Sequence, residues 1–212
     1  MLDGMRRIFI ISRQKCGTTS TAGFFRHHGF KVCEADGRYS KLWSLYHYSG
    51  RHELIFNSAR FGAHQVFEDE PWWRNGVFEV LVDRFPDAFF VLIKRDPVAW
   101  FDSLVKHRLR KKYFRGFDAL EYGLEAEFAE YLDSNREKID CDLFAPSNAT
   151  KEKYLSVYHA YHLKISELVT QLGIDNQFFQ GEIEDPLLWM KLGAFFDVTV
   201  RDGFSIHENK AV

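Results

Sequence analysis

Short apolar runs alternate with longer amphipathic stretches along this chain. Runs rich in β-branched and aromatic residues are typical of buried strands, and they predict strands at residues 7–11, 31–33, 65–67, 88–93 and 177–179. Apolar residues at helical spacing predict helices at residues 18–28, 73–85, 98–106, 120–135, 151–172 and 186–196. Strands that alternate with helices indicate an α/β fold, a three-layer parallel sheet with crossover helices.

The remaining segments add little to this pattern. Residues 35–60 favour helix without clear bounds, and residues 140–150 favour a loop in which Ser147 or Thr150 could cap the next helix. Gly173 is a plausible C-terminal cap, because glycine adopts the left-handed conformation found there. No repeat or linker divides the 212 residues, so a single domain over residues 1–212 is expected.

The first candidate site is the segment that follows the strand expected at residues 7–11. Helix N-termini bind anions through unpaired N–H groups and the helix dipole, so a strand, a tight loop and a helix start suit a phosphate-like group. Lys15 adds a positive charge, and the hydroxyl groups behind it add donors. The alternative is a plain N-cap that only starts the helix. The candidate ligands are Lys15, Cys16, Gly17, Thr18, Thr19 and Ser20.

The order of residues in this loop distinguishes between kinds of phosphate loop. Loops that bind nucleoside triphosphates place the Lys directly after the last Gly. Here Lys15 precedes Gly17 by two positions, and Ser12 stands where the first Gly would be. The order Lys-x-Gly-Thr-Thr-Ser resembles the 5′-phosphosulfate loop of sulfotransferases that use 3′-phosphoadenosine 5′-phosphosulfate (PAPS), enzymes with a P-loop-like nucleotide-binding fold.

The second candidate site follows the strand expected at residues 88–93. Asp96 and Pro97 suit the N-cap and first position of a helix, and Arg95 at the strand end can bind a phosphate with two N–H groups. Ser103 lies eight residues after Arg95, about two helical turns along. Sulfotransferases carry the same Arg-Asp-Pro with a Ser at this spacing, and the resemblance implies that Arg95 and Ser103 hold the 3′-phosphate of the cofactor.

The resemblance extends over most of the chain, to a compact bacterial-type branch of the family. It includes Trp100 and the segments 69–71, 85–88, 185–189 and 192–196. The chain departs from the larger cytosolic enzymes by lacking their C-terminal Arg-Lys-Gly-rich cofactor loop. The residues that could replace that loop, with Lys210 taken as a cofactor ligand, are Arg201, His207, Asn209 and Lys210.

A transfer reaction also needs a group that accepts the proton of the attacking hydroxyl or amine. The acidic residues 68–70 follow an expected strand, and the family pattern favours Asp69, with Glu68 as the alternative. Their other interpretation is as caps of a helix that starts near Trp72. Trp72 and Trp73 could line the acceptor pocket, although one of them is expected in the core. The histidines that could act as base instead are His27, His28, His64 and His107.

Composition and charge indicate which partners and which cellular compartment to expect. The net charge of −2 gives no general attraction to nucleic acid, and the 21 Phe are expected mainly in the core. The basic run at residues 106–115 is either a solvated helix face or an electrostatic funnel for an anionic cofactor. Three Cys without pairing or metal spacing, and no signal-like or membrane-spanning stretch, favour a cytoplasmic protein without membrane partners.

Three functions compete on these observations. The first is a PAPS-dependent sulfotransferase that needs no metal, releases 3′-phosphoadenosine 5′-phosphate (PAP) and modifies an unidentified small-molecule or glycan acceptor; a homodimer is compatible with it. The second is a P-loop kinase, and the third is a nucleotide-binding module without turnover. Binding of PAP without magnesium separates the first from the second. Sulfation of any acceptor separates the first from the third.

Overall fold

The computed structural model describes residues 6–34, 36–111, 148–201 and 204–206. The chain divides into two compact units, residues 1–95 with 169–212, and residues 96–168. The expectation of one domain over residues 1–212 stays a prediction. The helix predicted at residues 120–135 lies outside the described residues.

The first unit is built on a five-stranded parallel sheet in the order β2-β3-β1-β4-β5. All five strands fall where the apolar runs predict them, which confirms the parallel α/β fold. In the register, Phe9 of β1 lies beside Phe67 of β3 on one side and Phe90 of β4 on the other. The strands are β1 (Ile8–Ile10), β2 (Val32–Cys33), β3 (Val66–Phe67), β4 (Phe89–Lys94) and β5 (Phe178–Glu182).

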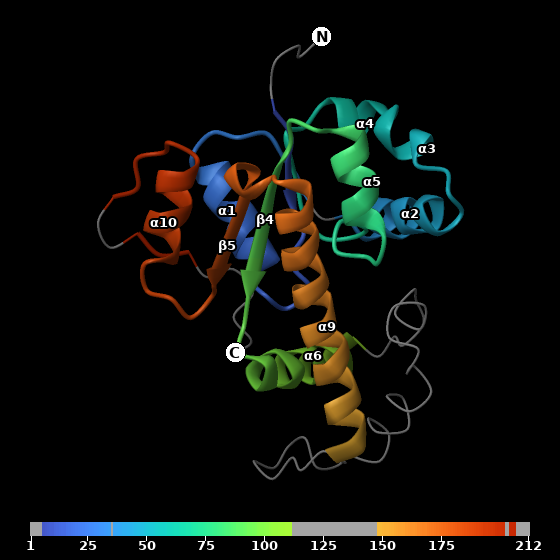
Figure 1. Ribbon diagram of the computed structural model, residues 1–212, viewed down its shortest axis with the longest axis vertical. Coiled ribbons are helices and arrows are strands. Elements are labelled where there is room, and N and C mark those ends of the chain that lie inside the picture. Colours follow the sequence, from blue (N-terminus) through green and yellow to red (C-terminus); the bar gives the residue numbers. More distant parts are fainter. Residues whose placement is uncertain (1–5, 35, 112–147, 202–203, 207–212) are drawn as a thin grey trace. The chain divides into compact units, whose positions relative to one another are not determined.

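Helices cover both faces of this sheet, which makes the three predicted layers (Figure 1). Successive strand residues point to opposite faces, so each face collects its own set of side chains. One face packs on α1 (Thr18–His27) and α10 (Leu188–Phe195), whose apolar side chains share a buried cluster with the strands. The other face carries α2 (Gly37–Tyr48), α3 (Glu53–Phe56), α4 (Ala59–Gly62) and α5 (Val77–Arg84).

Aromatic rings fill the second face. The fully buried Phe9 ring lies 5.2 Å from the rings of Phe67 and Trp72 and 5.7 Å from that of Phe85, measured between centroids. Trp43 of α2 joins this group through Trp72, at 5.6 Å. Many of the phenylalanines therefore form core, as predicted, and they fix α2 against the sheet close to the strand ends.

Several helices differ from their predicted bounds, and α6 (Pro97–Lys111) also continues beyond the predicted end at residue 106. α5 begins at Val77 rather than at residue 73, because Gly76, with a φ of 80°, is its N-cap and residues 70–75 form turns behind a cis Glu70–Pro71 bond. Residues 35–60 form three short helices, α2 to α4. α9 (Asn148–Leu172) begins inside the predicted loop, so Thr150 is a residue within the helix rather than its N-cap, while Ser147 lies outside the described residues.

Two predicted helix caps are confirmed, the C-terminal cap at Gly173 and the N-cap at Asp96. Gly173 follows α9 with a φ of 64°, the left-handed conformation of a C-terminal cap. Asp96 is the N-cap of α6 (Pro97–Lys111), because its Oδ1 accepts a hydrogen bond from the Ala99 amide at 2.8 Å, and Pro97 is the first helical residue.

The second unit, where it is described, consists of α6 and most of α9. Their aromatic side chains pack together, with Trp100 and Tyr158 at 4.4 Å and Phe101 and Tyr154 at 5.7 Å between ring centroids. Lys151 lies 3.9 Å from the Asp102 carboxylate. Among the described helices, none has both the length and the apolar character that crossing a bilayer requires.

Candidate active site

The carboxyl ends of the parallel strands meet at one edge of the sheet in the first unit. In open α/β sheets this edge holds the ligand, next to neighbouring strands whose connections leave in opposite directions. Here those strands are β1, which connects onward to β2, and β4, which connects onward to β5 on the other side. The segments that follow the strand ends are therefore the candidate site.

Ser12 fixes the start of the loop after β1. Its side chain is fully buried, and its Oγ accepts a hydrogen bond from the Ile93 amide at 2.6 Å and donates one to the Val91 carbonyl at 3.4 Å. The residue that replaces the first Gly of a nucleotide loop thus ties β1 to β4. Sequence reasoning noticed Ser12 only as a departure from the nucleoside-triphosphate pattern.

Gly17 fixes the end of the same loop. Its φ of 80° is the left-handed conformation that favours glycine, and a Cβ at this position would lie 2.6 Å from Cδ1 of Ile183, which follows β5. The Gly17 carbonyl accepts a hydrogen bond from the Thr21 amide at 2.9 Å, which starts α1. The left-handed conformation favours glycine here, and a larger residue would in addition displace the end of the Ile183 side chain.

The side chains around Gly17 suit an anion. α1 has no acidic residue in its first turn, and Thr18, Thr19 and Lys15 are partly exposed beside it. Cys16 and Ser20 are buried; the Cys16 amide donates to the Arg13 carbonyl at 3.2 Å and so shapes the loop, whereas Ser20 lies in the first turn of α1. The first-turn N–H groups and one Lys therefore face the edge of the sheet without an opposing carboxylate in the helix.

Arg95, directly after β4, joins the loop to the segment after β5. Its Nη1 donates to the Lys15 carbonyl at 3.3 Å, and its Nε lies 3.6 Å from Oε1 of Glu184. The Arg95 side chain is 32% exposed, which leaves it accessible to a ligand. Ser103 lies on α6 in the second unit, so its joint action with Arg95 stays a prediction, and Lys210 lies outside the described residues.

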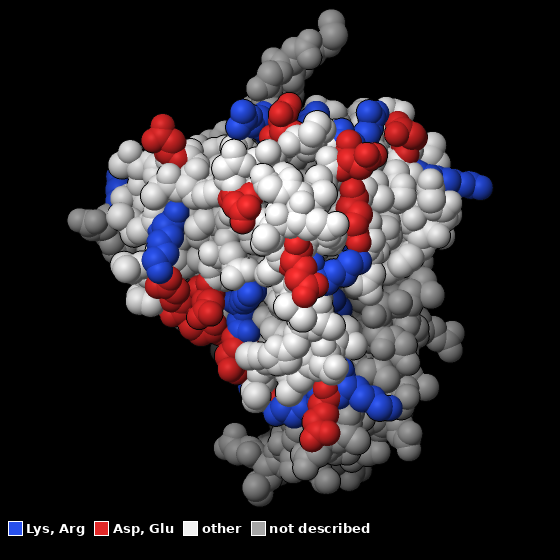
Figure 2. All heavy atoms as spheres, viewed as in Figure 1, with Lys and Arg blue, Asp and Glu red and all other residues white. Residues whose placement is uncertain are grey.

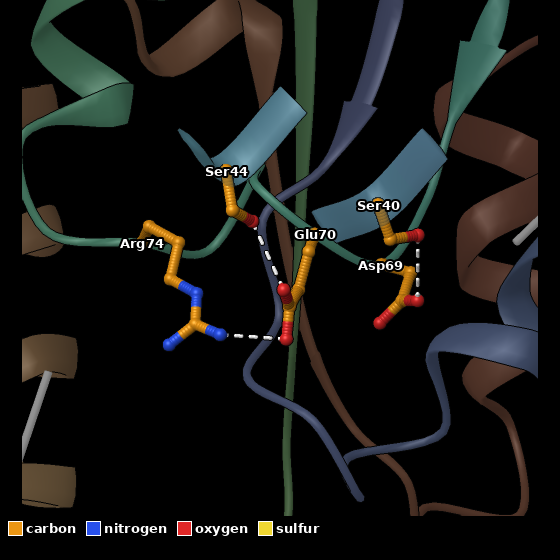
Figure 3. A network of polar contacts seen from close by, with 5 residues as sticks. All are labelled: Ser40, Ser44, Asp69, Glu70 and Arg74. Carbon is orange, nitrogen blue, oxygen red and sulfur yellow. Dashed lines mark hydrogen bonds and ion pairs between the residues drawn. The ribbon is translucent and has the colours of Figure 1, made fainter. Parts of the chain in front are cut away.

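The acidic residues after β3 occupy three different environments, of which Figure 3 shows those of Asp69 and Glu70. Glu68 is 5% exposed. Glu70 is paired, with Oε1 at 2.6 Å from Nη2 of Arg74 and Oε2 at 2.9 Å from the Ser44 hydroxyl. Asp69 is partly exposed and accepts a hydrogen bond from the Ser40 hydroxyl at 3.2 Å. Since Gly76 is the N-cap of α5, the acidic residues do not cap that helix.

Asp69 has the electrostatic character of a proton acceptor. Burial raises the pKa of its carboxyl above the usual range, and the neighbouring Glu70 charge raises it further, while the Ser40 hydroxyl acts in the other direction. A carboxylate whose pKa is raised holds a proton more readily and is the better general base. Glu68 and Asp69 follow β3, the direct neighbour of β1, at the same edge as Lys15.

Backbone conformation singles out the same two residues. Among the described residues, three that are not glycine have a positive φ: Lys15 at 68°, Asp69 at 67° and Asp197 at 54°. Asp197 comes just after the end of α10, where a left-handed residue is ordinary. The left-handed conformation is unfavourable for residues with a Cβ, and it is concentrated at functional sites. Lys15 and Asp69 are two of the three catalytic candidates predicted from the sequence, the third being Glu68.

Both tryptophans are buried, which confirms the expectation that one of them belongs to the core and does not favour either ring as an acceptor contact. Trp72 is 1% exposed and belongs to the aromatic core on the α2 side of the sheet. Trp73 is fully buried, with the guanidinium groups of Arg74 and Arg13 at 4.2 Å and 5.5 Å from its ring centroid. Both rings anchor the segment that carries Asp69.

Three of the four alternative histidine bases, those in the first unit, lie away from the carboxyl edge of the sheet. His64 precedes β3, whereas Asp69 follows it, and its Nδ1 lies 2.7 Å from the Arg60 carbonyl. His27 and His28 stand at the far end of the 10-residue α1 from Gly17, about 15 Å along the helix axis. His107 belongs to the second unit. The geometry of the first unit thus favours the carboxylates.

Sequence reasoning missed the residues that surround the two carboxylates, Ser40, Ser44 and Arg74. Two signals were available. Ser40 and Ser44 are spaced by four residues, which places them on one face of a helix, and Arg74 follows Glu70 by four. Both patterns are common on solvated helices, so neither indicates a site until the fold brings α2 beside the end of β3.

Surface charge in the described residues is mixed. Figure 2 shows acidic and basic side chains interspersed over one face, in keeping with the net charge of −2. Of the basic run at residues 106–115, the side chains of Lys106 and His107 are described, exposed and partly exposed respectively. The funnel for an anionic cofactor stays a prediction.

Comparison with known proteins agrees with the motifs. A family model described as a sulfotransferase domain matches residues 7–211, and the chain therefore belongs to the sulfotransferase family. Among solved structures, the chain resembles a sulfotransferase from Alicyclobacillus acidocaldarius, with a TM-score of 0.55 and 18% identity, over 98% of this chain and 86% of that one. No curated protein matches the chain. The predicted family and the α/β fold are thus confirmed.

Proposed function

We propose that this sulfotransferase moves a sulfuryl group from PAPS to a hydroxyl or amine of a small-molecule or glycan acceptor. The observation that carries the proposal is the convergence of three segments on the carboxyl edge around β1. These are the loop with Lys15 before α1, Arg95 after β4 and Asp69 after β3. Each segment supplies a different part of the chemistry.

The donor set fits PAPS. The amides and hydroxyl groups at the start of α1, with Lys15, would hold the 5′-phosphosulfate, since this helix end has no acidic residue in its first turn. Arg95 would hold the 3′-phosphate together with Ser103, and Lys210 would add a further contact. When bound, PAPS supplies the sulfuryl group that the acceptor receives.

Asp69 and Lys15 would then have different roles in the transfer. Asp69 takes the proton of the acceptor hydroxyl or amine as the acceptor atom bonds to sulfur. Lys15 and the loop amides stabilise the negative charge that develops on the bridging oxygen as its bond to sulfur breaks. Positioning and electrostatics supply the catalysis, with PAP as the other product.

The residues after β4 distinguish this proposal from a P-loop kinase. A kinase of that class needs a metal-holding Asp near the phosphates, whereas Lys94 and Arg95 stand at the end of β4, next to β1. Two cations at this place suit a donor with an additional phosphate. The proposed compartment is the cytoplasm, and neither nucleic acid nor membrane is a proposed partner.

The test of the proposed activity is transfer of labelled sulfate. The protein is incubated with PAPS that carries ³⁵S and with a panel of phenols, aliphatic alcohols, amines and glycans, and the products are separated by chromatography. We expect label in at least one acceptor and PAP in equal amount. Release of labelled sulfate without any labelled acceptor across the panel would count against the transferase activity.

Replacing Arg95 by Ala tests how the 3′-phosphate is read. The variant should bind PAP about 10- to 100-fold more weakly, since a charge-assisted contact is worth roughly 1.5–3 kcal/mol. Binding of adenosine 5′-phosphosulfate, which lacks the 3′-phosphate, should change little. Titration calorimetry with both ligands measures the two effects.

Arg84→Ala is the matched control for this comparison. Arg84 is an exposed arginine at the end of α5, ion-paired with Glu53. It should bind both nucleotides as the wild type does. Equal losses of PAP and adenosine 5′-phosphosulfate binding in Arg95→Ala would show that Arg95 does not read the 3′ position.

A further inference from the structure

Two serines on one face of α2 each hold one of the adjacent carboxylates after β3. Ser40 donates to Oδ2 of Asp69 at 3.2 Å, and Ser44, one helical turn later, donates to Oε2 of Glu70 at 2.9 Å (Figure 3). Both serines are buried. α2 is itself fixed by Trp43 against Trp72, so the serine hydroxyl groups are held in place by core packing.

The two carboxylates are not equivalent in this arrangement. The Glu70 carboxylate is compensated by Arg74 at 2.6 Å, and Arg74 is stacked on Trp73. Asp69 has no comparably close cation among the groups that shift its pKa. The Arg74 charge lowers that pKa, but it has the smallest effect of these groups. The Ser40 hydroxyl and the Glu70 amide are the groups that bond to the Asp69 carboxylate. Both hydrogen bonds lower the pKa of Asp69, whereas burial and the Glu70 charge raise it.

We propose that Ser40 is a positioning residue for the Asp69 carboxylate. By occupying Oδ2, the Ser40 hydroxyl fixes the rotation of the carboxylate and leaves Oδ1 to take the acceptor's proton. Ser44 and Arg74 hold the neighbouring Glu70 away from this role. The inference rests on the proposed function of Asp69 as the base.

The hydrogen bond has a second consequence for the reaction. A donor to the ionised carboxylate favours the charged form, so Ser40 keeps Asp69 ready to accept a proton despite its burial. The charged groups that act on Asp69 are Glu70 from the same segment and Arg74 from the turn before α5, and both remain when Ser40 is replaced. The change in titration caused by removing the Ser40 hydroxyl can therefore be attributed to that hydroxyl.

The experiment compares Ser40→Ala and Ser40→Thr with the wild type. Alanine is a good helix residue, and Ser40→Ala is expected to fold. In Ser40→Ala the acid limb of the kcat profile should move to higher pH, and on that limb turnover should fall about tenfold, the effect of one hydrogen bond to a charged group. Ser40→Thr retains the hydroxyl and should restore the limb. PAP affinity should be unchanged in both variants.

Direct titration of Asp69 separates this inference from the proposed function. The carboxyl carbon of Asp69 is followed by NMR in the protein without nucleotide, where no turnover is needed, and its pKa should rise in Ser40→Ala. Ser49→Ala, at the exposed end of the same helix, should leave that pKa as in the wild type. An unchanged Asp69 titration in Ser40→Ala would overturn the inference. Full activity of Asp69→Asn would instead overturn the role of Asp69 as base.

Discussion

Asp69→Asn is expected to lower turnover by about 10²–10⁴-fold while PAP binds as in the wild type. The amide keeps the shape of the side chain and can still accept the Ser40 hydrogen bond, but it cannot take a proton. Asn also tolerates the left-handed backbone that Asp69 adopts at a φ of 67°. Turnover is measured as formation of PAP with the acceptor found in the sulfate-transfer screen.

The same substitution should stabilise the folded protein at neutral pH. The pKa of Asp69 is raised on folding, so its ionisation destabilises the native state as the pH rises above the ordinary value of 3.8 and through the folded pKa. Below 3.8 both states are protonated and the gain disappears. Urea unfolding of the wild type and Asp69→Asn from pH 4 to pH 8 should show a difference that grows with pH.

Two comparisons decide how an Asp69 result is interpreted. Asp83→Asn, on the exposed face of α5, should change neither turnover nor the pH dependence of unfolding. If Asp69→Asn keeps its activity and Glu68→Gln loses it, the base is Glu68. If both variants are fully active, the carboxylates after β3 do not accept the proton.

Lys15→Ala is expected to lower kcat by about 10²–10³-fold, with a much smaller change in PAP affinity. The Lys15 ammonium group is assigned to the charge that develops on the bridging oxygen, which is larger in the transition state than in the bound nucleotide. Removing an interaction made mainly in the transition state lowers kcat rather than binding. Single-turnover measurements and PAP calorimetry give the two quantities separately.

The backbone at Lys15 supplies the control for this experiment. Lys15→Gly removes the same charge but relieves the left-handed conformation at a φ of 68°, so it should be more stable than Lys15→Ala and equally slow. Lys191→Ala removes an exposed lysine on α10 and should be fully active. Near-normal turnover in both Lys15 variants would refute the role of this lysine.

Much of the fold could be predicted because strands buried on both faces are nearly continuous apolar runs. The runs around Phe9 and Phe90 mark β1 and β4 without any knowledge of their neighbours. Helix starts were predictable where a single residue decides them, as at Gly17 and Asp96. The start of α5 was not, because residues 72–76 look like a helical pattern while the turns behind Pro71 are set by burial of two tryptophans.

The candidate site likewise contains residues that local sequence predicts and residues that only the packing of the fold brings to the site. Lys15, Arg95 and Asp69 were predictable because each follows a recognisable strand, and parallel strands bring their carboxyl ends to one edge. Ser40 and Arg74 belong to this edge only through the packing of Trp43 and Trp72, which joins segments about thirty residues apart. No local pattern carries that information. Sequence left two places open for Trp72 and Trp73, pocket or core, because an aromatic residue beside a site suits either, and both rings are buried.

Titration calorimetry with PAP in the presence of EDTA tests the assignment as a PAPS-dependent enzyme most directly, because it requires no acceptor. We expect PAP to bind without magnesium, to bind more tightly than adenosine 5′-phosphosulfate, and to lose that preference in Arg95→Ala. ATP with magnesium, titrated in a parallel experiment, should bind more weakly than PAP. Tight binding of magnesium ATP together with no detectable binding of PAP would contradict the assignment.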